Sequence, residues 1–74
     1  MSQYPSITGN DLIKALSKPG FRVTRIKGSH HRLEHPDGRR TTVPVHGKEN
    51  LGPGLLLKIL RDVDLSRAAL LELL

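Results

Sequence analysis

The sequence predicts an α+β domain of two layers, in which helices cover one face of a three-stranded antiparallel sheet. Three observations in the 74 residues predict this class: apolar residues at helical spacing near both ends, alternating apolar and polar residues in the middle, and Gly- or Pro-containing turns between these segments. Helices gathered on one face of such a sheet form a stable layered domain. The predicted order is α-β-β-β-α with an added short C-terminal helix, in a single domain over residues 1–74.

The first helix is predicted to begin after Thr8, because Thr8 and Asp11 form a capping-box pattern in which Asp11 stands in for the usual Glu or Gln. An apolar helical face follows, and Pro19-Gly20 ends the helix. Residues 1–7 are predicted to form a flexible arm. They contain neither a basic start nor an apolar run, so a signal peptide is not expected.

Two helices are predicted near the C-terminus. Pro53 suits the first turn of a helix that ends near residues 62–64. Ser66 caps a short last helix over residues 66–74. The leucines of this last helix either pack over the core or leave apolar surface for a partner or a second copy: Leu70, Leu71, Leu73 and Leu74.

Three strands are predicted between the helices. Residues 21–24 alternate apolar and polar side chains, and Ile26 breaks that phase, which suggests a bulge or strand end near Arg25. Residues 30–35 and 40–45 form the second and third strands. The predicted turns between them are Gly28-Ser29 and Pro36-Asp37-Gly38.

Positive charge is concentrated in the middle of the chain. Residues 18–48 contain eight Lys or Arg and two Asp or Glu, a net charge of +6, whereas the remainder has four basic and five acidic residues, a net of −1. Such a stripe favours a polyanionic partner, most often nucleic acid, although a solvated sheet face has the same composition. The absence of cysteine excludes disulfides and thiolate metal sites and suits the cytoplasm. No apolar run approaches the roughly 20 residues that span a membrane.

The histidines are the candidate groups for acid–base chemistry, because histidine is the residue type that titrates near neutral pH. Side chains alternate across a strand, so a core position for Leu33 places His31 and His35 on the helix side. His30 and Arg32 then point to the open, basic face. His31, beside apolar neighbours, is expected to be half-buried and hydrogen-bonded.

The register of the second and third strands follows from the hairpin loop. A three-residue loop over residues 37–39 pairs Leu33 with Val43 and sets His30 opposite His46. Zinc is disfavoured, since His30 and His31 point to opposite faces and a His30–His46 pair lacks a third ligand. We therefore expect no metal and no other cofactor.

At these residues the chain resembles the HicA family, the toxin half of HicA–HicB toxin–antitoxin systems. The resemblance covers nearly the whole length and is specific as an ordered set of segments. These are the helix before Gly20-Phe21, Lys27-Gly28-Ser29-His30-His31, His35-Pro36-Asp37-Gly38-Arg39, Thr42-Val43-Pro44-Val45-His46, and Leu51-Gly52-Pro53-Gly54-Leu55.

The resemblance implies a double-stranded-RNA-binding-like fold, endoribonuclease activity on messenger RNA, and neutralisation by a HicB-type antitoxin. The family's functional histidine carries over to His30, with His31 as the alternative. We expect metal-independent cleavage in which His30 acts as general acid or base beside positive charge. The residues expected to bind RNA are Lys27, Gly28, Ser29, Arg32, Arg40 and His46.

A plain RNA-binding module of the same fold is the alternative function, because the basic face would be the same without catalysis. The histidines among the basic residues favour the enzyme. The free chain is expected to be a monomer or a weak homodimer without a membrane association.

Overall fold

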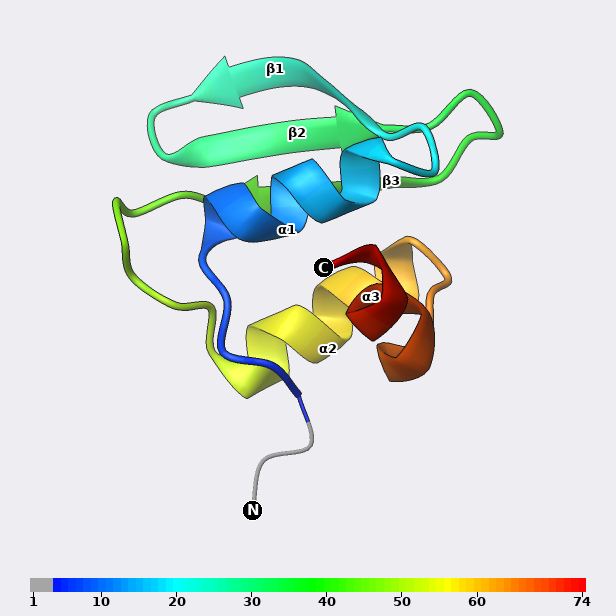
Figure 1. Cartoon of the computed structure of the whole chain (residues 1–74). Coiled ribbons are helices and arrows are strands. Elements are labelled where there is room, and N and C mark those ends of the chain that lie inside the picture. Colours follow the sequence, from blue (N-terminus) through cyan, green and yellow to red (C-terminus); the bar gives the residue numbers. More distant parts are fainter. Residues whose placement is uncertain (1–3) are drawn as a thin grey trace.

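The computed structural model describes residues 4–74. Its elements in chain order are α1 (Gly9–Ser17), β1 (Arg22–Lys27), β2 (His30–Glu34), β3 (Arg40–Pro44), α2 (Pro53–Asp62) and α3 (Arg67–Leu73). The strands form one antiparallel sheet in the order β1-β2-β3 (Figure 1). The predicted α+β order with its added C-terminal helix is confirmed. No helix within residues 4–74 is long and apolar enough to cross a membrane.

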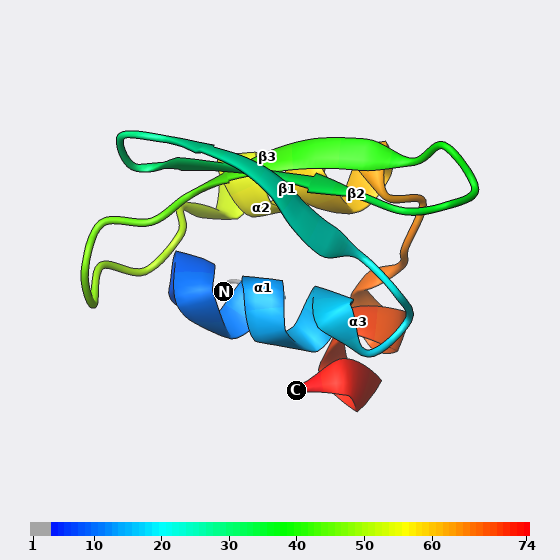
Figure 2. The same ribbon diagram turned by 90° about the horizontal axis from the view of Figure 1, so that it is seen from above.

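The helices and the sheet form two layers around one core (Figures 1 and 2). Leu33 of β2 and Val43 of β3 are completely buried, whereas their neighbours Arg32 and Thr42 are exposed. The helices contribute the facing apolar side chains, which include Leu12, Leu16, Leu56, Ile59 and Leu70. One face of the sheet is therefore covered by helices and the other is open.

The start of α1 is fixed by the predicted capping box. The Asp11 N–H donates to Thr8 Oγ1 at 3.1 Å, and the Thr8 N–H donates to Asp11 Oδ2 at 3.2 Å. Of the arm predicted over residues 1–7, residues 1–3 lie outside the described part. Ile7 is buried and its carbonyl accepts a hydrogen bond from the Leu51 N–H at 2.8 Å, so packing ties the end of the arm to the core.

The leucines of the last helix divide between the two predicted roles. Leu70 is completely buried and Leu73 packs against the core. Leu71 and Leu74 remain 48% and 49% exposed. Ser66 caps the helix as predicted, with its hydroxyl accepting a hydrogen bond from the Ala69 N–H.

The hairpin between β2 and β3 closes one residue earlier than predicted. The His35 N–H donates to the Arg39 carbonyl at 2.9 Å, so the loop is residues 36–38 and not 37–39. Gly38 has a φ of +99°. Three-residue hairpin loops place such a residue last, because the chain must leave the turn in a left-handed conformation that glycine adopts without strain.

This loop shifts the strand register by two residues from the predicted one. Leu33 pairs with Thr41, and His30 pairs with Pro44. The predicted pairing of His30 with His46 is wrong, because His46 lies beyond the end of β3. A shift of two residues keeps each side chain on its predicted face, so the assignment of inward and outward residues holds.

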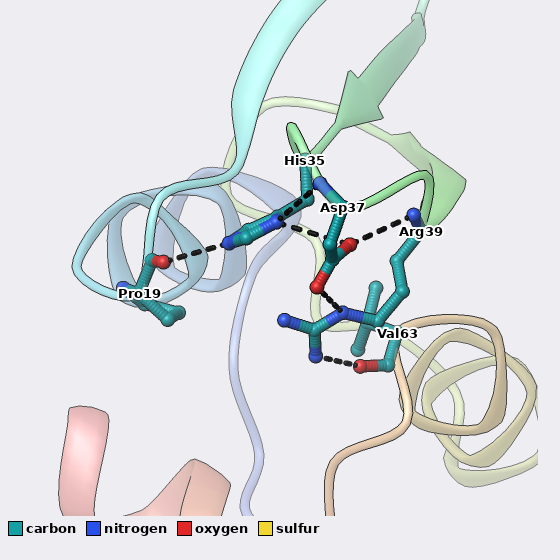
Figure 3. Close-up of polar contacts among 5 residues, drawn as sticks. All are labelled: Pro19, His35, Asp37, Arg39 and Val63. Carbon is teal, nitrogen blue, oxygen red and sulfur yellow. Dashed lines mark hydrogen bonds and ion pairs between the residues drawn. The ribbon is translucent and has the colours of Figure 1, made fainter.

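A polar network joins the hairpin loop to the ends of two helices (Figure 3). This network, called the clasp below, consists of Pro19, His35, Asp37, Arg39 and Val63. His35 Nε2 lies 3.0 Å from the Pro19 carbonyl at the end of α1, and His35 Nδ1 lies 3.1 Å from the Asp37 backbone nitrogen. The Pro19 carbonyl requires Nε2 to donate. Nδ1 also lies 3.0 Å from Asp37 Oδ1, so it accepts from the Asp37 backbone N–H when the ring is neutral and forms an ion pair with the Asp37 carboxylate when the ring is protonated. Arg39 donates from Nε to Asp37 Oδ2 at 2.8 Å and from Nη1 to the Val63 carbonyl at the end of α2 at 2.6 Å.

A tilted contact between two rings, with an interplanar angle of 58°, and charge strengthen this clasp. The Phe21 ring lies 5.0 Å from both the His35 ring and the Arg39 guanidinium carbon. The Arg39 backbone N–H, bonded to Asp37 Oδ1, lowers the pKa of Asp37. Desolvation opposes this effect, while the Arg39 side chain and His35 add to it. The clasp thus includes a carboxylate that the fold keeps ionised.

Gly9→Ala should destabilise the fold. A Cβ at Gly9 would overlap the Pro44 carbonyl oxygen, which is backbone and cannot rotate away. We expect a loss of more than about 2 kcal/mol in the free energy of unfolding, measured by urea titration. Gly54→Ala is the matched control, because a Cβ there meets nothing within 4 Å. It should stabilise α2 by about 0.5–1 kcal/mol. Equal effects of the two variants would contradict the close packing of α1 on β3.

Asp37→Asn should reduce the acid sensitivity of the fold. Since folding lowers the pKa of Asp37 from its ordinary value of 3.8, the ionised carboxylate stabilises the folded chain above that value. This stabilisation disappears as the pH falls through the lower folded pKa. Urea titrations between about pH 6 and pH 2 should show a smaller loss of stability for the variant than for the wild type. Identical slopes would show that the clasp does not depend on this charge.

Candidate functional site on the open sheet face

The open face of the sheet is strongly basic. Its residues form three cross-strand rows: Arg22–Glu34–Arg40, Arg25–Arg32–Thr42 and Lys27–His30–Pro44. The rows contain five cationic side chains and a single carboxylate. Glu34 Oε2 lies 3.8 Å from Arg32 Nε, an exposed and therefore weak ion pair. A face with this charge attracts a polyanion.

A shallow hollow of about 260 Å³ lies over two of these rows. It is lined by Arg25, Lys27, His30, Arg32 and Thr42. The hollow therefore brings together a histidine ring, three cations and a hydroxyl. This set of groups has the chemistry to hold a phosphate and to transfer a proton beside it.

A bulge in β1 places two of the cations in the hollow. The pairing shifts between Val23 and Arg25, so Thr24 is the extra residue, as the broken sequence phase predicts. Beyond it, Arg25 pairs with Arg32, and Lys27 pairs with His30. Lys27 was predicted as a site residue, whereas Arg25 and Thr42 were missed. The break in apolar–polar alternation at Ile26 indicated a bulge. An extra residue at a bulge turns Arg25 onto the open face, so this break was the sequence signal that could have identified Arg25 as a site residue.

His30 and His31 occupy opposite faces, as predicted. His31 pairs with Val43, is half-buried, and has Nδ1 at 3.2 Å from the Ser29 carbonyl. His30 is exposed, and its ring has no hydrogen-bond partner within residues 4–74. The ring of His30 is therefore free to bind a ligand, while that of His31 is already engaged by the backbone.

The remaining predicted RNA-binding residues lie around the hollow without lining it. Gly28 and Ser29 form the turn between β1 and β2, and the Ser29 carbonyl accepts a hydrogen bond from the Val45 N–H at 2.7 Å. Arg40 pairs with Glu34, four residues along β3 from Pro44 and so roughly 13 Å away. His46 lines a separate hollow of about 160 Å³ with residues that include Glu49 and Leu55.

The described part of the chain was also searched for side chains that could bind a metal ion. Among the described residues, no three His, Asp or Glu side chains form a group that could hold a metal ion.

Comparison with known proteins adds one finding. A family model described as the HicA toxin of bacterial toxin–antitoxin systems matches residues 9–65. This range includes α1, the whole sheet, α2 and every residue of the hollow, while α3 lies beyond it. A search of curated proteins found no match.

Proposed function

The chain belongs to the HicA family of toxins of bacterial toxin–antitoxin systems, and from this premise we propose that it is an endoribonuclease that cleaves messenger RNA on the open sheet face. The observation that carries the proposal is the position of His30, exposed and unbonded among Arg25, Lys27 and Arg32 in one hollow. A plain phosphate-binding face needs only the cations. The histidine adds a group that transfers protons near neutral pH.

The proposed reaction is attack of the RNA 2′-oxygen on the adjacent phosphorus. The bond from phosphorus to the 5′-oxygen breaks, which leaves a 2′,3′-cyclic phosphate and a free 5′-hydroxyl. His30 takes the proton from the 2′-hydroxyl or gives one to the leaving 5′-oxygen, and water completes the other transfer. The three cations stabilise the negative charge that grows on the phosphoryl oxygens. His46 has no part in this scheme, because it lines a different hollow.

RNA is recognised through its backbone in this proposal. The three rows of the open face contain no Phe, Tyr or Trp, so stacking of bases on aromatic rings does not contribute. Phosphate and 2′-hydroxyl contacts remain, and these favour shape over sequence. A messenger RNA substrate also places the protein in the cytoplasm.

His30→Ala should abolish cleavage while the fold remains. Loss of the proton-transfer group should lower the rate of RNA cleavage by at least about 100-fold. Because His30 is exposed, the urea midpoint should stay near the wild-type value. The rate is measured on a 5′-labelled RNA with and without EDTA, and EDTA should leave the wild-type rate unchanged.

His46→Ala provides the matched control, since it removes another exposed histidine from outside the hollow. We expect at most a several-fold change in rate. A folded His30→Ala variant that cleaves as fast as the wild type would remove His30 from the mechanism. Wild-type protein that binds RNA and never cleaves it would identify an RNA-binding module instead.

A HicB-type antitoxin inhibits the enzyme by covering the basic face around His30 with acidic or apolar surface. In the complex, modification of His30 by diethyl pyrocarbonate should then be at least ten-fold slower than in the free chain, as measured by mass spectrometry. The complex unfolded in urea is the control and should regain full reactivity. Equal rates in the folded complex and the free chain would exclude direct occlusion.

A further inference from the structure

β1 differs from the other two strands because none of its residues is buried. In β2 and β3, the complete burial of Leu33 and Val43 determines which side chains face the helices. The corresponding residues of β1, Val23 and Ile26, remain 38% and 60% exposed. Burial therefore contributes little to deciding which side chains of β1 face the helices and which lie on the open face. This alternation is called the phase of β1 below.

Because burial does not fix which side chains of β1 face the helices, we looked to a hydrogen bond at the bulge. Thr24 Oγ1 donates to Glu34 Oε2 at 2.7 Å. Arg22, two residues before the extra residue Thr24, is the backbone partner of Glu34, so this bond ties Thr24 to a residue of β2 that is already paired with β1. A hydrogen bond to a carboxylate is stronger than one between neutral groups.

The phase of β1 decides the composition of the hollow. With the extra residue at Thr24, Arg25 and Lys27 lie on the face of His30, and Ile26 lies on the helix side. Without it, alternation would place Ile26 on the open face and turn both cations away.

We propose that Thr24 and Glu34 are a positioning pair that sets the phase of β1 and thereby places Arg25 and Lys27 beside His30. Neither residue lines the hollow. The inference rests on the proposed function only for its RNA readout, because the phase of the strand is measurable without RNA.

Thr24→Val tests the pair, since valine keeps the β-branched shape and removes the donor. The expected structural result is the loss of the cross-strand NOEs between Arg25 and Arg32. If both cations leave the hollow, affinity for a single-stranded RNA should fall about ten-fold at roughly 0.15 M salt. The slope of log K against log salt should decrease by about 1.4, or about 0.7 for each lost phosphate contact.

Two further variants separate positioning from other roles. Thr24→Ser retains the hydroxyl and should restore both the NOEs and the affinity. Glu34→Gln keeps an acceptor oxygen but removes the negative charge, so it should preserve the NOEs and bind RNA at least as tightly as the wild type. Unchanged methyl signals of Leu33 and Val43 show that each variant is folded.

Thr24→Val with wild-type NOEs and wild-type affinity would overturn the inference. A Thr24→Ser variant that behaves like Thr24→Val would also overturn it, because the hydroxyl would then not be the cause. If the wild-type chain binds no RNA, the proposed function fails, and the NOEs still decide the inference on their own.

Discussion

The open face of the sheet depends on the complete burial of Leu33 and Val43 against the helices. Because side chains alternate along a strand, these two residues force His30, Arg32 and Thr42 onto the opposite face. A slip of one residue in either strand would expose its buried side chain at a cost of about 1.5–3 kcal/mol and would turn its candidate site residues inward. The core therefore selects the face on which the candidate chemistry occurs.

Local patterns were sufficient for the order of elements, the Thr8 capping box and the faces of the strands, because each depends on neighbouring residues. The β2–β3 register was not predicted correctly, since a shift of two residues leaves every apolar side chain on the same face of the sheet and only changes its partner across the strands. The observed loop is distinguished by the hydrogen bond from the His35 N–H to the Arg39 carbonyl and by the positive φ of Gly38, its last residue. Arg25 was missed because an inserted residue reverses alternation. The clasp contacts of His35 with Pro19 and of Arg39 with Val63 join segments that are distant in the sequence, so no local sequence pattern predicts them.

The clasp and the hollow lie at opposite ends of β2. His35 follows the strand at the hairpin loop and is tied to the ends of α1 and α2 through the network in Figure 3. His30 begins the strand at the turn after β1. The groups that hold the layers together are thus separate from those proposed to act on RNA. Substitutions in the hollow therefore test the proposed function without removing a contact of the clasp.

The four histidines show why residue type alone does not identify the site. The ring of His35 is engaged by Pro19 and Asp37, and the ring of His31 by Ser29. His46 is exposed, yet its hollow contains Glu49 and no Lys or Arg. His30 alone among them combines a ring without a hydrogen-bond partner in the described chain with a lining of cations. A phosphate approaching this sheet meets attraction and a proton-transfer group at the same place only at His30.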